Sequence, residues 1–176
     1  MRFEIKEIGD DGLVVDLPIT EAWLAEECPG VEATLTRKGL RLRGTLTTTG
    51  DDVFLRGTVS GEMKSTCVRC LEEAKLPVSI PMLTTFVEES DEDEEEEDAN
   101  DDLDVATFDG DAIDLAPEIR DQLMLTLPLH PLCREDCRGL CPVCGVNRNQ
   151  KACTCEEKAR ESASPLAGLR NIKLSD

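Results

Sequence analysis

A dense cluster of cysteines near the C-terminal end is the strongest constraint in this sequence. Residues 133–155 read CREDCRGLCPVCGVNRNQKACTC, in which six of the 23 residues are cysteine. Two more cysteines, Cys67 and Cys70, are the first and last residues of CVRC, and the ninth is Cys28. We expect a cytoplasmic protein, because MRFEIKEIGDDG at the N-terminus lacks the apolar stretch of a secretion signal and no segment reaches the roughly 20 apolar residues of a membrane span. Cytoplasmic thiols are kept reduced, so clustered cysteines there indicate metal ligands rather than disulfides.

Eight of the nine cysteines fall into four closely spaced pairs. Two residues between thiols let the backbone curl so that both sulfurs point at one ion, and Gly145 after the pair in CPVCG can adopt the positive φ that favours this curl. Structural zinc takes four tetrahedral ligands, usually thiolates. We therefore predict two zinc ions, one on Cys67, Cys70, Cys133 and Cys137 and the other on Cys141, Cys144, Cys153 and Cys155. A single ion with the remaining thiols free, or free thiols without metal, are the alternatives that spacing leaves open.

An iron–sulfur cluster is the rival interpretation of the same cysteines. Cys137, Cys141 and Cys144 have the spacing with which radical S-adenosylmethionine enzymes hold such a cluster. Those enzymes resemble longer α/β barrels, whereas the residues before this motif indicate a β-meander. The additional thiols on both sides also favour closed coordination by a structural ion.

The sequence offers little from which to build a catalytic site. His130 is the only histidine and is isolated, so no Ser/His/Asp set can be assembled around it. We interpret this residue as a packed or surface side chain. No Gly-rich phosphate loop of the Walker type occurs. Catalytic zinc usually keeps an open position and uses histidine or carboxylate ligands. We therefore predict a non-enzyme, with no small-molecule substrate.

Hydrophobic periodicity predicts an α+β protein, mainly an antiparallel β-meander or barrel-like sheet with two or three helices and a C-terminal Cys-rich zinc-binding segment. RFEIKEI and GLVVDL are typical of short strands, and period-two alternation over residues 31–63 predicts further strands, with turns at Gly39, Gly50 and Gly61. Thr20 is a good N-cap for a helix that ends before Pro29. A second helix is expected from Asp114 or Leu115, with Pro117 in its first turn and Leu115, Ile119 and Leu123 on one apolar face. The predicted parts are a β-rich domain with one short helix (1–87), an acidic disordered spacer (88–104), a strand and helix that complete the core (105–132), a zinc-binding knuckle segment (133–155) and a C-terminal tail (156–176).

Almost all of the net charge of −19 comes from one stretch of the chain. Residues 88–127 carry 1 basic and 18 acidic side chains, and 13 of the 17 residues from 88 to 104 are acidic. Such a run repels itself and buries almost nothing, so we expect it to be disordered. The remaining parts are closer to neutral, and the acidic total does not exclude a local basic face.

Several motifs together resemble the YceD family, the large ribosomal RNA subunit accumulation proteins. The resemblance lies in CVRC at 67–70, in CRGLCPVCGVN at 137–147, in the later CTC, and in SPLAGL near the end of the chain. The sequence departs from the family pattern at Arg148, where relatives often have leucine. The resemblance implies a non-catalytic cytoplasmic factor needed for normal build-up of large-subunit ribosomal RNA.

The expected partners are large-subunit precursor ribosomal RNA, a ribosomal protein, or both. Basic residues on the meander and in the cysteine segment are the candidate RNA contacts: Arg37, Lys38, Arg41, Arg43, Arg134, Arg138, Arg148 and Lys151. Aromatic residues are scarce, at 3% of the chain, so a surface that stacks bases is not expected. The alternative is a protein-binding adaptor whose acidic segment recruits a basic partner.

Overall fold

The computed structural model describes residues 1–89 and 105–155. The chain divides into two compact units. The larger unit comprises residues 1–65 and 75–129, and the smaller unit comprises residues 66–74 and 130–176, of which 156–176 lie outside the described residues. The smaller unit therefore combines the loop that contains CVRC with the C-terminal cysteine segment.

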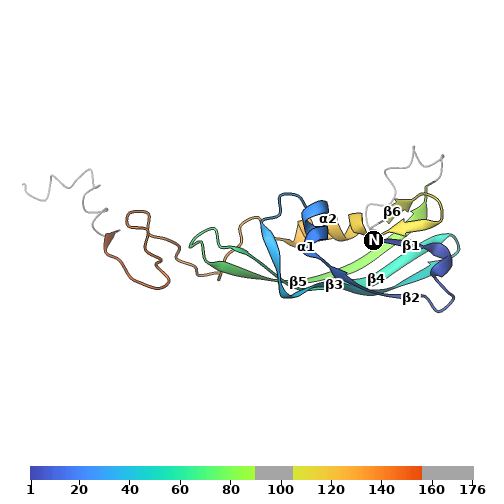
Figure 1. Cartoon of the computed structure of the whole chain (residues 1–176), viewed down its shortest axis with the longest axis horizontal. Helices are drawn as coiled ribbons and strands as arrows, with labels where there is room; N and C mark the ends of the chain where they lie inside the picture. Colours follow the sequence, from blue (N-terminus) through green and yellow to red (C-terminus); the bar gives the residue numbers. More distant parts are fainter. Residues whose placement is uncertain (90–104, 156–176) are drawn as a thin grey trace, which may run out of the picture. The chain divides into compact units, whose positions relative to one another are not determined.

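The α+β class with a mainly antiparallel sheet and two α-helices is confirmed for the described residues (Figure 1). In chain order the elements are β1 (Arg2–Glu4), the 3-10 helix η1 (Ile5–Glu7), β2 (Leu13–Ile19), α1 (Glu21–Glu27), β3 (Ala33–Thr49), β4 (Asp52–Thr66), β5 (Glu73–Glu88), β6 (Val105–Phe108), β7 (Ala112–Asp114) and α2 (Ala116–Thr126). The main sheet has the order β2-β3-β4-β5-β6, and β1 pairs with β7 in a second, two-stranded sheet.

The main sheet has one buried face and one exposed face. Along β5, buried and exposed residues alternate almost without interruption, as expected for a strand with one solvated side. Both helices lie over the same face of this sheet in the larger unit (Figure 1). Leu24 of α1 and Ile119 and Leu123 of α2 join the strand residues in one buried core, where Leu42 and Leu55 are fully buried.

Both predicted helices have the predicted N-terminal features. The Thr20 hydroxyl accepts a hydrogen bond from the backbone N–H of Trp23 at 3.2 Å and so caps α1. Pro117 lies in the first turn of α2, where its missing N–H costs nothing. Leu115, Ile119 and Leu123 are all fully buried, which confirms the predicted apolar face of this helix.

Two of the three turns predicted within residues 31–63 are wrong, and this part of the chain forms two long strands, β3 and β4. Gly50 does lie in the turn between β3 and β4, but Gly39 lies inside β3 and Gly61 inside β4. The register shifts between Leu35 and Leu40, and at this bulge a Cβ on Gly61 would lie 2.0 Å from the carbonyl oxygen of Gly39. Gly61 therefore permits close approach of two backbones, and Gly39 supplies a positive φ of 64° at the bulge, instead of either glycine reversing the chain.

The ends of the predicted strands needed further correction. The expected strand RFEIKEI stops at Glu4, and β1 pairs with β7, a strand that the sequence analysis missed. Glu88, expected to begin the spacer, is the last residue of β5 and pairs with Phe108 of the parallel strand β6. Residues 90–104, the remainder of that spacer, lie outside the described residues.

The prolines of β5 occupy the part of the strand that β6 does not pair with. The β5–β6 pairing covers only Thr85 to Glu88, so Pro77 and Pro81 stand where one side of β5 has no strand neighbour among the described residues. A strand edge tolerates the missing N–H of proline. In residues 1–89 and 105–155, no helix combines the length and apolar character that a membrane crossing requires.

Candidate metal centres

The first pair of thiols lies on the loop that joins β4 to β5. Cys67 directly follows the last residue of β4. The backbone N–H of Leu71 donates to the carbonyl oxygen of Cys67 at 2.9 Å, and the N–H of Cys67 donates to the carbonyl oxygen of Glu72 at 2.8 Å. These bonds curl the loop so that Cys67 and Cys70 lie close together.

The CPVCG segment repeats this local fold. The backbone N–H of Gly145 donates to the carbonyl oxygen of Cys141 at 2.8 Å, and the N–H of Cys141 donates to the carbonyl oxygen of Val146 at 2.9 Å. Gly145 has φ 70°, and Leu71, at the matching position of the first loop, has φ 61°. Two short segments of different sequence thus adopt the same turn, which is the turn predicted for a pair of metal-ligating thiols.

The eight paired cysteines converge in two groups of four in the smaller unit. In each group the four sulfurs all lie within 4.8 Å of one another. The first thiol group is Cys67, Cys70, Cys133 and Cys137, and the second thiol group is Cys141, Cys144, Cys153 and Cys155. These are the two sets that the spacing predicted to share an ion, and each set offers four sulfur ligands. Cys28, the remaining cysteine, is buried in the core of the larger unit.

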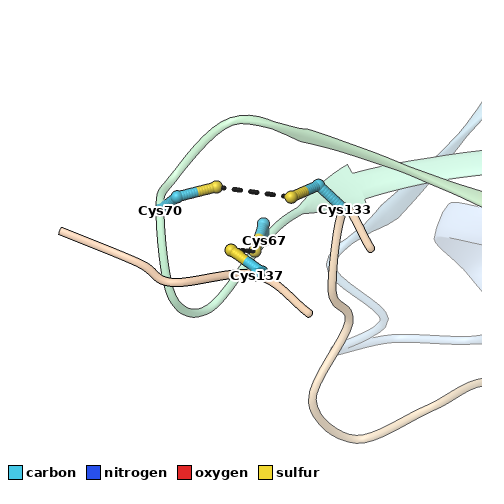
Figure 2. Close-up of side chains that lie close together, drawn as sticks. All are labelled: Cys67, Cys70, Cys133 and Cys137. Atoms are coloured by element: carbon cyan, nitrogen blue, oxygen red, sulfur yellow. Dashed lines mark hydrogen bonds between the residues drawn. The ribbon is translucent and has the colours of Figure 1, made fainter. Parts of the chain in front are cut away.

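The first thiol group has the dimensions of a tetrahedral four-sulfur site. Figure 2 shows the four side chains pointing toward one another, with Cys67 facing Cys137 and Cys70 facing Cys133. The Sγ atoms of Cys67 and Cys137 are 3.8 Å apart, and those of Cys70 and Cys133 are 3.5 Å apart. A zinc–sulfur bond of about 2.3 Å in tetrahedral geometry separates sulfurs by about 3.8 Å, so the donor set fits such an ion.

Backbone N–H groups make one thiol in each group unusually acidic. Burial raises the pKa of Cys67, but hydrogen bonds from the backbone N–H groups of Cys133, Cys70 and Arg69 outweigh burial and lower the pKa to about 6. For Cys141, the N–H groups of the CPVCG turn lower the pKa to about 7 against the effect of burial. Each turn therefore stabilises a thiolate, which is the form that binds metal.

Two members of each group show the opposite shift, Cys70 and Cys133 in the first and Cys153 and Cys155 in the second. Burial, followed by hydrogen bonds with Cys70 and the other thiols, raises the pKa of Cys133 to about 12. Its hydrogen bond with Cys144, and then burial, raises the pKa of Cys155 to about 11. Adjacent thiolates repel, so four of them share a small volume only when a cation balances their charge. The donor set and its electrostatics both fit a metal ion.

The smaller unit has little else to hold it together. Among its described residues, 66–74 and 130–155, the apolar cluster contains only buried Ala74 and half-buried Leu132 apart from cysteines. The guanidinium of Arg69 donates to the carbonyl oxygen of Cys137 at 3.0 Å, and the backbone carbonyl oxygen of Arg69 accepts from the N–H of Leu140 at 2.9 Å. Sequence reasoning did not find this role of Arg69, because a single arginine between two cysteines carries no signal of what it contacts.

Asn149 is a second contributor that sequence reasoning missed. Its Nδ2 donates to the Sγ of Cys137 at 3.2 Å. This hydrogen bond has the largest effect on the pKa of the Cys137 thiol and holds that pKa below its usual value. Neighbouring asparagine and cysteine residues in a loop-rich segment give no pattern from which such a contact could be predicted.

The rival iron–sulfur arrangement does not match the geometry. Cys137 belongs to the first thiol group, whereas Cys141 and Cys144 belong to the second. The three thiols of that motif are thus divided between two groups of sulfurs. His130 is exposed and belongs to neither group.

The predicted basic residues fall into two sets, one in each unit. In the larger unit, Arg41 and Arg43 lie on the exposed face of β3 beside Asp16, with nitrogen–oxygen distances of 2.8 and 3.6 Å. Lys38 pairs with Glu62 at 3.4 Å, and Arg37 is exposed.

The members of the second set, in the smaller unit, differ from one another in exposure. Arg134 pairs with Asp136 at 3.1 Å and also donates to Asn149 at 3.0 Å. Arg138 and Lys151 are exposed, and Arg148 is half-buried. Ion pairs therefore involve members of both sets.

Arg56 was missed by the sequence analysis although it is exposed on β4. It is opposite Thr45, two positions along β3 from Arg43, which in turn is opposite Thr58. The same period-two pattern that predicted the strand could have placed Arg56 on the face of Arg41 and Arg43. This exposed sheet face, on which Arg41, Arg43 and Arg56 lie with Asp16, is called the basic sheet face below.

Fold and site together define a class: a protein with a helix-covered, mainly antiparallel sheet and a small second unit organised around two four-thiol groups. The chain belongs to the family described as large ribosomal RNA subunit accumulation protein YceD, whose sequence model matches residues 55–173. That match begins in β4 and includes all eight paired cysteines.

Several curated proteins are similar to this chain. An uncharacterised protein of Mycobacterium tuberculosis (strain ATCC 25618 / H37Rv) is 34% identical over 96 residues, which cover 54% of this chain and 45% of that protein. A maize protein, large ribosomal RNA subunit accumulation protein YCED homolog 1, chloroplastic, is 40% identical over 58 residues, or 32% of this chain and 20% of its own length. The uncharacterised protein YlbN of Bacillus subtilis (strain 168) is 25% identical over 138 residues, covering 78% of this chain and 76% of YlbN. The chain thus spans less than half the length of the mycobacterial and maize relatives, and no solved structure matches it.

Proposed function

We propose that this protein is a non-enzymatic cytoplasmic factor for accumulation of large-subunit ribosomal RNA, and that it binds the precursor RNA through the basic sheet face. Membership of the YceD family supports the biological role. The observation that carries the proposal is the cluster of three arginines on this sheet face, of which Arg43 and Arg56 are exposed and Arg41 is half-buried beside the carboxylate of Asp16. Such a face attracts phosphates.

The composition of the basic sheet face favours contact with the RNA backbone over reading of bases. Thr45, Thr58 and Ser60 lie on β3 and β4 at positions opposite or next to the arginines. Hydroxyl and guanidinium groups bind phosphate and ribose oxygens, whereas sequence-specific reading of single strands relies on aromatic stacking. With only 3% aromatic residues in the chain, we expect recognition of charge and shape.

We further propose that zinc occupies both thiol groups and serves as scaffold. Eight sulfurs in two closed groups of four leave no ligand position for substrate, which is typical of structural zinc. The ions would fold the smaller unit and so position its basic residues, including the predicted contacts Arg134, Arg138, Arg148 and Lys151.

RNA binding can be tested with charge reversal on the basic sheet face. Arg43→Glu changes an arginine whose side chain is 67% exposed, and Lys6→Glu, at a lysine that is 77% exposed in η1, is the control with the same change of charge. We expect Arg43→Glu to weaken binding to a transcript of the large-subunit precursor RNA and to reduce the salt slope of log K by about 0.7–0.9, as for one lost phosphate contact. Equal behaviour of the two variants would remove the basic sheet face from the proposal.

A protein-binding adaptor is the second candidate, favoured by the 13 acidic residues among positions 88–104. Here the acidic stretch would hold a basic ribosomal protein, and contact with RNA would be indirect. Purification from cells with and without nuclease separates the two. A basic protein that stays bound after nuclease treatment, and is lost when residues 88–104 are deleted, supports the adaptor. Loss of every partner together with the RNA supports direct RNA binding.

A further inference from the structure

The two thiol groups are linked by a short loop that belongs to one group and contacts the other. Residues 145–152 connect Cys144 to Cys153, so the residues on both sides of this loop belong to the second thiol group. Asn149, from the same loop, donates through Nδ2 to the Sγ of Cys137 in the first thiol group at 3.2 Å. A side chain positioned by one group therefore contacts a sulfur of the other.

Asn149 is itself held in place by several hydrogen bonds. Its Oδ1 accepts from the backbone N–H of Arg138 at 2.8 Å and from the guanidinium of Arg134 at 3.0 Å. Its backbone N–H donates to the Oδ1 of Asn147 at 3.0 Å. The amide orientation is fixed by this network, because Oδ1 accepts two donors and only Nδ2 is left to face the sulfur.

Other residues of the loop fasten it to the CVRC turn. The side chains of Asn147 and Gln150 both donate to Oε1 of Glu72, at 3.1 and 2.9 Å. Glu72 also accepts, through its backbone carbonyl, the N–H of Cys67. The loop thus touches the first thiol group through Cys137 and through the residue that closes the Cys67 turn.

The order of this loop depends on the second thiol group. The loop contains a single apolar residue beyond its glycine and alanine, Val146, and that side chain is only half-buried. Ligation of Cys144 and Cys153 to one ion closes the loop and removes most of the entropy that would otherwise oppose it. Without the ion, the loop has little apolar burial with which to hold Asn149 at Cys137.

From this geometry we infer that Asn149 couples the two metal centres, so that metal at the second thiol group raises the metal affinity of the first. This inference rests on the proposed metal binding. Partners that hydrogen-bond a metal ligand typically contribute 10–100-fold to metal affinity. By linkage, metal at the first thiol group raises the affinity of the second by the same factor.

The test uses the full-length chain, stripped of metal under reducing conditions and titrated with Co²⁺, whose thiolate complexes absorb visible light. The double variant Cys144→Ser/Cys155→Ser disables the second thiol group, and we expect its remaining site to bind Co²⁺ at least tenfold more weakly than the first site of the unmodified chain. Asn149→Ala in the otherwise unmodified chain should weaken the first site by a similar factor. Added to the double variant, Asn149→Ala should have no further effect.

Two further variants separate coupling from general loss of structure. Asn149→Asp keeps the acceptor oxygen for Arg138 but replaces the N–H donor at the Cys137 sulfur by an oxygen, so we expect it to weaken the first site as well. Lys151→Ala, at an exposed position of the same loop, should leave both affinities unchanged. Competition with Zn²⁺ should give the same order of variants.

The outcomes distinguish the coupling from the metal assignment on which it rests. Two ions that bind independently, or an Asn149→Ala variant with unchanged first-site affinity, would overturn the coupling and leave the two centres standing. Failure of the unmodified chain to bind Co²⁺ or Zn²⁺ would overturn the metal centres themselves.

Discussion

Removal of metal should unfold the smaller unit and spare the larger one. Apart from cysteines, the apolar cluster in the described part of the smaller unit holds only Ala74 and Leu132. Full burial of a leucine contributes about 3 kcal/mol at most, and Leu132 is half-buried. A structural four-ligand zinc site contributes about 10–16 kcal/mol. The ions therefore outweigh apolar burial several-fold in this unit, whereas the larger unit has an extensive core of its own.

Limited proteolysis with trypsin reads out both units in one experiment. In the presence of reductant and a strong chelator, we expect rapid cleavage after Arg134, Arg138 and Arg148 in the smaller unit. Cleavage after Arg43 and Arg56, which lie within the paired strands β3 and β4, should stay slow. Restoring Zn²⁺ should protect the smaller unit again. Equal cleavage of the smaller unit with and without chelator would refute the reasoning.

Three further changes test the larger unit by denaturant unfolding. Gly61→Ala should lower the free energy of unfolding by more than about 3 kcal/mol, because the new Cβ would lie 2.0 Å from a carbonyl oxygen. Gly110→Ala is the control: Gly110 has φ 75° and nothing within 4 Å of a Cβ, so the substitution should cost only about 1 kcal/mol of backbone strain. Equal losses would contradict the packing at the bulge. Leu123→Ala should cost about 2.7–5 kcal/mol, since the side chain is fully buried in the core, and a loss below 1 kcal/mol would contradict that burial. Burial raises the pKa of Asp114, but hydrogen bonds from the N-terminal amino group and a backbone N–H outweigh it and hold the pKa below its usual value. The carboxylate thus stabilises the fold above its unfolded pKa of about 3.9, so the stability difference between the unmodified chain and Asp114→Asn should be present at pH 7 and disappear as the pH falls below 4; a constant difference would contradict this.

Local signals in the sequence predicted the local structure well. The cap at Thr20 and the buried face of Leu115, Ile119 and Leu123 follow from interactions within a few residues, and both are confirmed. The pairing of neighbouring thiols also followed from short spacings, because a Cys-x2-Cys turn can place two sulfurs on one ion wherever it occurs, whereas which pairs come together depends on the fold. The same rule applies to CVRC and to CPVCG, which adopt equivalent turns.

Features fixed by distant contacts could not be predicted in this way. Gly39 and Gly61 were interpreted as turns because glycine usually marks one, yet both lie at a bulge between β3 and β4, where Gly61 permits close approach of the backbones and Gly39 has a positive φ. The strand β1 pairs with β7, more than 100 residues away in the sequence, and three-residue strands carry no periodicity. The contact of Asn149 with Cys137 likewise depends on how two thiol groups pack, which no local pattern specifies.

The metal content of the purified protein tests the central claim most directly. Elemental analysis of the chain, purified in the presence of reductant and without chelator, should find two zinc ions per chain. The Cys144→Ser/Cys155→Ser variant should retain no more than one. A chain without bound metal, or with an amount that cysteine substitution does not change, would contradict the assignment of the two thiol groups as metal centres.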